Sequence, residues 1–133
     1  MNCIFCKIIK GEIPSYKIYE DEYTYAFLDI AKDVDGHTLV IPKKHVVNVL
    51  DCDIETLNHV MDTVKKICNH YVNDLVYEGC NILNASGEAA QQTVMHLHFH
   101  IIPRKANDGV DSWPKYEGAK NELPQMHELL KIK

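Results

Sequence analysis

The spacing of hydrophobic residues predicts one long helix in the middle of this 133-residue chain. Between Asp53 and Leu75, apolar side chains recur every three or four positions, which is the period of an amphipathic helix. The stripe that they form consists of Ile54, Leu57, Met61, Val64, Cys68, Tyr71 and Leu75. Asp51 or Asp53 can cap the first turn, where acidic residues also suit the helix dipole. We expect this stripe to pack on a core.

Shorter runs of β-branched and aromatic residues predict strands on both sides of that helix. Lys17–Glu20 and Tyr23–Leu28 are separated by two acidic residues and indicate a hairpin. Three further runs predict strands: His37–Pro42, Cys80–Leu83 and Met95–Ile102, the last of them stopped by Pro103.

The two ends of the chain predict a short helix or turn and a short helix. The run CIFCKIIKG reads as a short helix or turn closed by Gly11, and Pro124–Leu130 reads as a second short helix. Hairpin strands followed by a long helix favour an α+β fold. We expect a five-stranded, mostly antiparallel sheet with one long helix and one short helix. The length of the chain predicts a single domain over residues 1–133.

Composition and charge narrow the possible functions. Hydrophobic residues make up 46% of the chain and charged residues 25%, as in ordinary globular proteins. The net charge of −5 argues against nonspecific binding of nucleic acid, which requires a basic surface. No run of about 18 apolar residues and no secretory leader is present, so we expect neither a membrane span nor export. The five cysteines are then expected to be reduced thiols in the cytoplasm.

Three of the eight histidines fall within five residues: His96, His98 and His100. Alternate residues of a strand share a face, so these imidazoles should line one face while the intervening apolar residues pack on the core. Such a row can ligate a metal, act as nucleophile and general acid or base, or consist of structural histidines with hydrogen-bond partners. Burying three imidazoles together is costly without such partners, which disfavours the purely structural interpretation.

The residues that precede these histidines favour phosphate chemistry. Ser86–Ala90 supplies small residues whose backbone N–H groups can face an anion, and Gln92 and Thr93 add neutral donors. A hard divalent cation would be expected to have a pair of carboxylates beside the histidines. The sequence has no such pair there. The predicted chemistry is therefore that of a phosphoryl group.

Four segments of the chain resemble the histidine triad (HIT) family of nucleotide-binding proteins. HLHFHII, residues 96–102, resembles the family signature H-φ-H-φ-H-φ-φ, in which φ is apolar. CIFCKIIKGEIPSYKIYEDE, FLDI and GHTLVIPKKH are similar to its N-terminal segment, its ribose-side segment and its central strand. The resemblance covers residues 3–104 in order. It implies a HIT-like fold with residues 1–104 as the core and 105–133 as a more variable C-terminal segment.

The resemblance implies that the protein is a hydrolase. The middle histidine of the triad, here His98, would attack the α-phosphate of a purine nucleotide and form a covalent nucleotidyl-histidine that water then hydrolyses. His100 would bind the phosphate oxygens, and His96 completes the triad. The expected substrates are purine nucleoside phosphoramidates or related AMP-linked compounds. Dinucleoside polyphosphates are an alternative, and so is a nucleotide- or partner-binding protein with hardly any turnover.

The resemblance also implies a nucleotide-binding site and a homodimer. Asp29 matches the acid that binds the ribose hydroxyls, although by itself it reads as a turn-forming residue. Ser86, Gln92 and Thr93 would lie on the phosphate side. Trp113 matches a tryptophan that reaches across a dimer interface towards the partner's site. Six residues that otherwise read as core would form the base pocket: Ile4, Phe5, Ile8, Phe27, Leu28 and Ile30.

Cys3 and Cys6 form a C-x-x-C pair near the start of the chain. Alone, the pair is compatible with a redox site, half of a zinc site or two small apolar residues. In the HIT proteins that share this pair, zinc is held by both cysteines, by the histidine after IPKK and by the first triad histidine. The resemblance therefore implies a structural zinc ion at Cys3, Cys6, His45 and His96.

Two positions depart from the family pattern. Ala85 stands where relatives usually carry an asparagine, and Gln91 stands where they usually carry a glycine. A side chain at position 91 can hold the backbone away from the phosphate, or it can donate a hydrogen bond in place of the missing asparagine. These alternatives have opposite effects on the rate. The remaining histidines receive no functional role from the sequence: His37, His59, His70 and His127.

Overall fold

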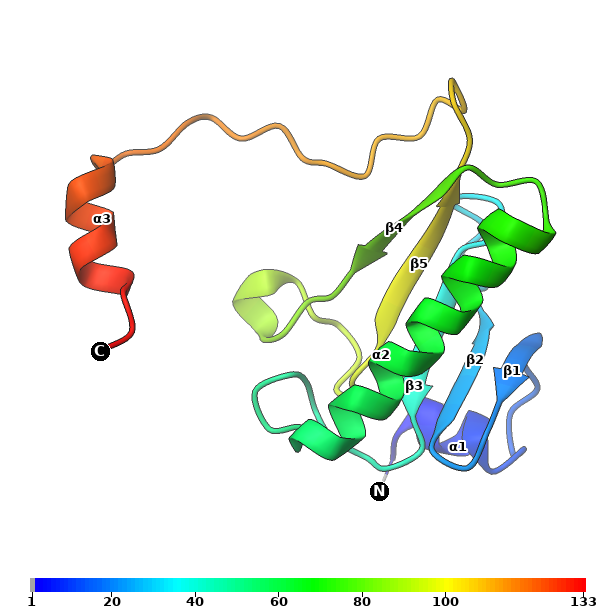
Figure 1. The fold of residues 1–133 in the computed structure, drawn as a ribbon. Helices are drawn as coiled ribbons and strands as arrows, with labels where there is room; N and C mark the ends of the chain where they lie inside the picture. Colours follow the sequence, from blue (N-terminus) through cyan, green and yellow to red (C-terminus); the bar gives the residue numbers. More distant parts are fainter. Residues whose placement is uncertain (1) are drawn as a thin grey trace.

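The computed structural model describes residues 2–133 and has the expected α+β architecture (Figure 1). Its strands are β1 (Lys17–Glu20), β2 (Thr24–Leu28), β3 (Thr38–Pro42), β4 (Gly79–Leu83) and β5 (Phe99–Arg104). The α-helices are α1 (Ile4–Ile9), α2 (Ile54–Asn69) and α3 (Leu123–Leu130). A π-helical turn, η1 (His70–Asp74), continues α2, and a 3₁₀ turn, η2 (Glu88–Ala90), lies before β5. All four strand pairings are antiparallel, in the order β1-β2-β3-β5-β4.

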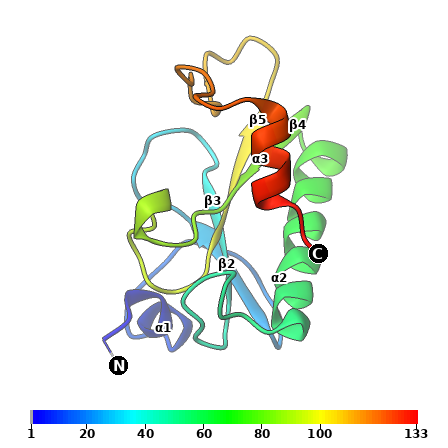
Figure 2. The same cartoon turned by 90° about the vertical axis from the view of Figure 1, so that its left-hand side faces the viewer.

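The sheet separates two apolar clusters, because alternate side chains of each strand point to opposite faces. Helix α2 covers one face and α1 lies on the other (Figure 2). On the α2 side, Ala26 and Val40 are fully buried against Val60 and Val64. On the α1 side, Phe5 packs edge-on against Phe27 of β2, with ring centroids 5.5 Å apart.

The buried face of α2 matches the expected stripe in part, since Val64 and Tyr71 are buried and Leu57 and Cys68 pack against the same cluster. The residues that it buries are Val60, Thr63, Val64 and Ile67, followed by Tyr71 in η1. Ile54, Met61 and Leu75 were expected to be buried but are 70%, 37% and 48% exposed. Helix α2 carries two neighbouring apolar stripes. The stripe that faces the sheet lies beside a buried hydrogen bond, in which the hydroxyl of Thr63 on α2 is 2.7 Å from the hydroxyl of Thr24 on β2.

Strand β5 begins and ends later than the apolar pattern indicates. Residues 95–98 lie outside the ladder, because the N–H of Leu97 donates to the carbonyl of Val46 at 2.8 Å, in the loop before α2. The strand then passes through Pro103 instead of stopping there. Pairing with β3 ends at Ile101, so the missing N–H of Pro103 removes no hydrogen bond on that side.

The chain after β5 forms an arm that ends in α3 (Figure 1). Its start is anchored where the Arg104 guanidinium donates to Asn81 at 2.7 Å and to Asp108 at 2.9 Å. Beyond this point the arm extends past the β4 edge of the sheet, and α3 buries none of its residues. Within residues 2–133, no helix is both long enough and apolar enough to cross a lipid bilayer.

The corrected face of α2 predicts which substitutions destabilise the fold. Ile67→Ala should lower the free energy of unfolding by about 2–5 kcal/mol, because it leaves a cavity at a side chain that is only 3% exposed. Ile30→Ala is the matched control and should change it by less than about 0.5 kcal/mol, since Ile30 is 78% exposed. Urea unfolding at one fixed protein concentration measures both. Equal losses in the two variants would contradict this packing.

Candidate active site and metal centre

The three triad histidines share the α1 face of the sheet, as the alternation predicts. Leu97, Phe99 and Ile101 belong to the cluster on the α2 side. The imidazoles therefore face the other way, where the ring of Phe5 lies 5.8 Å from that of His96 and 5.2 Å from that of His98, centroid to centroid. The short helix α1 thus forms one wall of the site.

A backbone carbonyl fixes the tautomer of His98. Its Nδ1 lies 2.8 Å from the carbonyl oxygen of His96. A carbonyl can only accept, so Nδ1 carries the proton and the neutral ring keeps its lone pair on Nε2. The carbonyl of His98 accepts a hydrogen bond from the Asn84 side chain at 2.9 Å, which ties the same residue to the loop after β4. In the neutral form of His98, Nε2 is therefore the nitrogen that is available as a nucleophile.

His100 belongs to a hydrogen-bonded chain that the sequence did not reveal. Its Nδ1 lies 2.8 Å from Nε2 of His37, and Nδ1 of His37 lies 2.9 Å from the Asp33 carboxylate. The Asp29 carboxylate is 3.8 Å from the same His37 ring. Burial, together with the neighbouring His98 and His37 rings, lowers the pKa of His100 to about 4. His100 is therefore neutral near pH 7 in the free protein.

Four thiol and imidazole groups converge beside the triad. The Sγ of Cys3 lies 3.4 Å from Nδ1 of His96, and the Sγ of Cys6 lies 3.4 Å from Nδ1 of His45. The two Nδ1 atoms are 3.2 Å apart. A tetrahedral zinc ion, with bonds of about 2.3 Å to sulfur and about 2.0–2.1 Å to nitrogen, places neighbouring ligand atoms about 3.3–3.8 Å apart. The donor set and its spacing therefore fit zinc.

The environment of His96 suits a metal ligand. Its Nε2 donates to the carbonyl of Pro42 at 2.9 Å, which leaves the lone pair on Nδ1, the atom that faces the two thiols. The residue is fully buried, and burial lowers its pKa to about 4, so the ring stays neutral as metal binding requires. Both ring nitrogens are engaged in this way, which leaves neither of them for a substrate.

The loop before the triad is held together by its own side chains. The amide nitrogen of Gln92 donates to the carbonyls of Val47 and Val94 at 2.6 and 3.0 Å, and its oxygen accepts from the N–H of Gly87 and from Asn48. Gln92 was expected to contact phosphate, but its side chain is 4% exposed and braces the loop instead. Asn48 has no signal in the sequence that would single it out.

The other two loop residues expected on the phosphate side differ in their contacts. The Ser86 hydroxyl accepts from the N–H of Val49 at 3.1 Å and donates to Asn84 at 2.9 Å. Thr93 is exposed. Gln91 has a left-handed backbone conformation with φ of 73°, the conformation that glycine adopts without strain. Beside it, a cavity of about 440 Å³ is lined by residues that include Ala85, Gln91, His37 and His100.

The structure brings only some of the residues expected to bind the nucleoside close together. Asp29 lies next to the His37–His100 pair, and one of its carboxylate oxygens accepts the N–H of Ala31 at 2.8 Å. Phe5, Ile8 and Phe27 are buried in the α1-side cluster, and Leu28 is half-buried. The most exposed of the set are Ile4, Ile30 and Trp113, at 50%, 78% and 73%, and Trp113 lies on the C-terminal arm.

Comparison with known proteins supports the resemblance of this chain to the HIT family. The HIT domain model matches residues 10–107. The adenosine 5'-monophosphoramidase hnt1 of Schizosaccharomyces pombe is 39% identical over 136 aligned positions, which cover all of this chain and 98% of that protein. A HIT family protein from Bacillus anthracis has a solved structure that is 43% identical, with a TM-score of 0.82 over 96% of this chain and 92% of that one.

A zinc-bound structure is also among the similar proteins. It is a histidine triad family protein from Mycobacterium smegmatis, 40% identical, with a TM-score of 0.79 over 84% of this chain and 81% of that one. The family model covers nearly three quarters of the sequence, and the triad lies within the part that it matches. This chain therefore belongs to the HIT domain family.

Proposed function

We propose that this protein is a nucleotide hydrolase that cleaves the α-phosphate bond of purine nucleoside phosphoramidates or related AMP-linked compounds. The observation that carries the proposal is the fixed tautomer of His98, which directs a lone pair on Nε2 away from the backbone. The substrate class is supported by the name of the S. pombe relative, which is similar along the whole chain.

The proposed reaction has two steps. In the first, the Nε2 lone pair of His98 forms a bond to the α-phosphorus while the bond from phosphorus to the leaving nitrogen breaks. That nitrogen keeps the electron pair, takes up a proton from solvent and leaves as the free amine. In the second step, water attacks the phosphorus and gives up a proton to solvent while the P–N bond to His98 breaks. The products are a nucleoside monophosphate and the amine, and the imidazole of His98 is regenerated.

The chain of His100, His37 and Asp33 supports this chemistry electrostatically. A bound phosphate brings negative charge next to His100, which favours the protonated form of this imidazole and raises its pKa from the low value in the free protein. His37 accepts from His100, and Asp33 in turn holds His37. The positive charge that faces the phosphate is therefore spread towards a carboxylate.

The nucleoside is proposed to lie next to this chain. Asp29 would accept both ribose hydroxyls, since it is beside His37 and only half-buried. Ile4 and Ile30 would contact the purine, with Phe5 and Phe27 as the apolar floor behind them. Zinc bound by Cys3, Cys6, His45 and His96 would have a purely structural role, because four protein ligands leave no open position.

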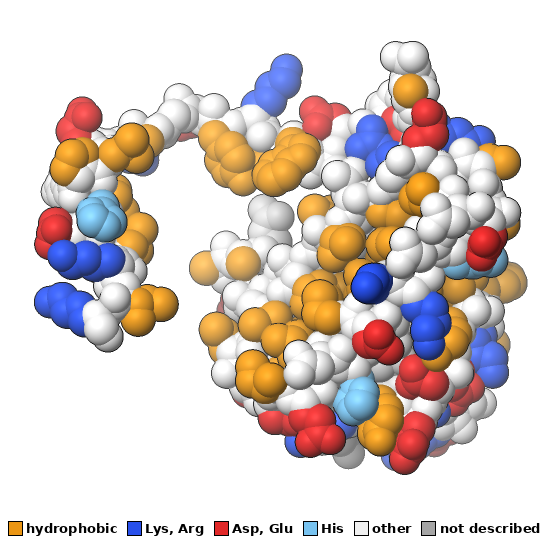
Figure 3. Space-filling view, viewed as in Figure 1, with side chains coloured by type: hydrophobic (Ala, Val, Ile, Leu, Met, Phe, Trp, Pro, Cys, Tyr) orange, Lys and Arg blue, Asp and Glu red, His pale blue; other side chains and the backbone are white. Residues whose placement is uncertain are grey.

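The protein is further proposed to be a cytoplasmic homodimer that pairs through β4 and α2. Strand β4 is at one edge of the sheet, and its Ile82 is 50% exposed. The outer stripe of α2 contributes Ile54 and Met61, and apolar side chains gather over this face in Figure 3. A second copy that adds its own β4 would cover both elements. The five cysteines are unpaired in the structure, which agrees with a reducing compartment.

Removing the nucleophile should separate catalysis from binding. His98→Ala should lower kcat by at least about 10³-fold and leave nucleotide affinity nearly unchanged, because the lost bond exists only along the reaction path. Steady-state hydrolysis of an adenosine phosphoramidate and calorimetric AMP binding measure the two quantities. His59→Ala is the matched control, because His59 lies on α2, on the other side of the sheet from the triad. Its ring stacks on that of Tyr23, with the ring centroids 3.7 Å apart. A His98→Ala protein with the parent kcat would refute the proposed nucleophile.

Metal content should follow the thiol cluster. Protein purified without chelator should contain about one zinc ion per chain by elemental analysis. Cys3→Ala should lose this zinc and unfold at lower temperature, whereas Cys52→Ala should keep both properties, because Cys52 lies outside the cluster. If the parent protein contains no metal at neutral pH, the proposed zinc site is wrong, and Cys3 and Cys6 are ordinary thiols.

The left-handed conformation of Gln91 predicts the effect of restoring glycine. Gln91→Gly should raise kcat, because glycine adopts φ of 73° without strain and lets backbone N–H groups approach the phosphate. One well-placed donor is typically worth about 2.7–4 kcal/mol in the transition state. The opposite result, a slower Gln91→Gly enzyme that Ala85→Asn accelerates, would show that the Gln91 side chain replaces the missing asparagine. Steady-state kinetics of both variants decides the sign.

A further inference from the structure

A second group of potential metal ligands lies outside the thiol cluster. One carboxylate oxygen of Asp29, one ring nitrogen of His37 and one ring nitrogen of His100 lie within 4.8 Å of one another. Asp29 directly follows β2 and His37 directly precedes β3, and the N–H of Asp29 donates to the carbonyl of His37 at 2.8 Å. His100 lies on β5, opposite Leu39 of β3. The three central strands of the sheet therefore position all three groups.

Asp33 orients His37 in the way that metal-binding histidines are usually held. Nδ1 of His37 lies 2.9 Å and 3.2 Å from the two carboxylate oxygens of Asp33. A carboxylate only accepts, so in the neutral ring Nδ1 carries the proton and the lone pair is on Nε2, which faces His100 and Asp29. Metal-ligating histidines almost always donate their other ring N–H to a carboxylate, a carbonyl or water. His37 therefore has the orientation of a metal ligand.

The distances between the three ligand atoms are close to those around a divalent ion. Nε2 of His37 is 2.8 Å from Nδ1 of His100 and 3.8 Å from Oδ2 of Asp29. Ligand atoms about 2.0–2.2 Å from an ion are about 3.0 Å apart at right angles and about 3.3–3.5 Å apart at the tetrahedral angle. Shifts of at most about 1 Å would suit either geometry. The proton of His100 would then move from Nδ1 to Nε2, which frees the Nδ1 lone pair for the ion.

The site would be open, in contrast to the thiol cluster. Oδ1 of Asp29 accepts the N–H of Ala31 at 2.8 Å, and this contact holds the carboxylate with Oδ2 towards His37. The cavity of about 440 Å³ beside His37 and His100 has room for water as further ligands. Two imidazoles and one carboxylate suit divalent transition-metal ions such as Zn²⁺ and Co²⁺. With three protein ligands and no thiolate, the site would bind such an ion more weakly than the thiol cluster.

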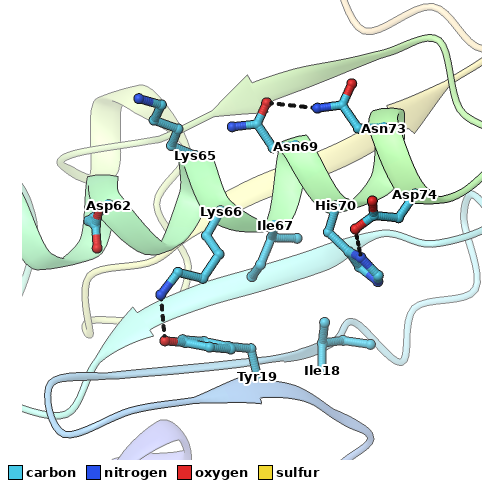
Figure 4. Close-up of a pocket in the computed structure, with 10 residues that line it drawn as sticks. All are labelled: Ile18, Tyr19, Asp62, Lys65, Lys66, Ile67, Asn69, His70, Asn73 and Asp74. Carbon is cyan, nitrogen blue, oxygen red and sulfur yellow. Dashed lines mark hydrogen bonds and ion pairs between the residues drawn. The ribbon is translucent and has the colours of Figure 1, made fainter.

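The groove between β1 and α2 holds a histidine–carboxylate pair that lacks a third ligand (Figure 4). There, Nδ1 of His70 lies 2.8 Å from the Asp74 carboxylate, and Lys65 and Lys66 line the same groove. Within residues 2–133, neither His70 nor Asp74 belongs to a group of three potential metal ligands. His70 is therefore a matched control for the effect of an imidazole beside a carboxylate.

We propose that Asp29, His37 and His100 form a second metal site, which binds a divalent transition-metal ion and excludes the nucleoside while it is occupied. The exclusion rests on the proposed function, in which Asp29 accepts both ribose hydroxyls. With Oδ1 on the N–H of Ala31 and Oδ2 on the ion, the carboxylate has fewer lone pairs left for two hydroxyls. The ion and the nucleoside therefore compete for Asp29, and the metal-bound protein is an inhibited form of the hydrolase.

Equilibrium dialysis with Co²⁺ at neutral pH tests the metal site. The parent chain should bind one Co²⁺ ion beyond the ion of the thiol cluster, and this second ion should add no thiolate-to-metal charge-transfer band, because none of its ligands is sulfur. Asp29→Asn should weaken its binding by at least about 10-fold, and Asp33→Asn by about 10–100-fold, as for the loss of an outer-shell partner. His70→Gln should leave it within about 2-fold of the parent.

Two results of the dialysis would overturn the metal site. The first is the absence of a second bound ion up to about 1 mM Co²⁺. The second is an unchanged affinity for that ion in both Asp29→Asn and Asp33→Asn. Circular dichroism of each variant shows whether it keeps the parent fold, so that a loss of binding is assigned to the substituted group.

Adenosine tests the exclusion, since it carries the ribose hydroxyls but no phosphate that would itself bind Co²⁺. Saturating adenosine should raise the dissociation constant of the second Co²⁺ ion by at least about 10-fold. An unchanged constant with adenosine bound would refute the exclusion. If adenosine does not bind the parent chain freed of the second ion, the proposed nucleoside site is wrong and the exclusion with it, whereas the dialysis decides the metal site independently.

Discussion

Strict alternation of side chains between residues 96 and 101 is the constraint on which the site depends. Leu97 and Ile101 are fully buried and Phe99 is 9% exposed, all on the α2 side of the sheet. Each such side chain contributes about 1.5–3 kcal/mol by leaving water. A shift by one residue would expose these groups and place three imidazoles in an apolar cluster. The core therefore fixes which face the histidines occupy, before any of them contacts a metal or a substrate.

Two backbone carbonyls then give neighbouring histidines different chemistry. The Pro42 carbonyl takes the Nε2 proton of His96, so this ring presents Nδ1 to the thiols. The His96 carbonyl takes the Nδ1 proton of His98, so that ring presents Nε2. Both acceptors are main-chain atoms near the sheet, which hold their positions better than long side chains. Identical side chains two residues apart can therefore serve as metal ligand and nucleophile.

The sequence predicted the local elements and the row of imidazoles, because these depend on periodicity over a few residues. It failed where the outcome depends on contacts between distant segments. Two apolar stripes run along α2, and the hydrogen bond between Thr63 and Thr24, 39 positions apart, distinguishes them. His37 had no assigned role because its partner His100 lies 63 positions further along the chain. The buried amide of Gln92 likewise braces a loop that no sequence pattern marks.

Helix α1 connects the cluster of Cys3, Cys6, His45 and His96 to His98, the proposed nucleophile. It is only six residues long, too short to be stable without external contacts. Cys3 at its start and Cys6 within it face His96 and His45, while Phe5 packs edge-on against His98. The His96 backbone also supplies the carbonyl that fixes the His98 tautomer. Whatever orders the four thiol and imidazole groups therefore also orders the wall beside His98 and the carbonyl that fixes its tautomer. The geometry of the proposed active site thus depends on the cluster next to it.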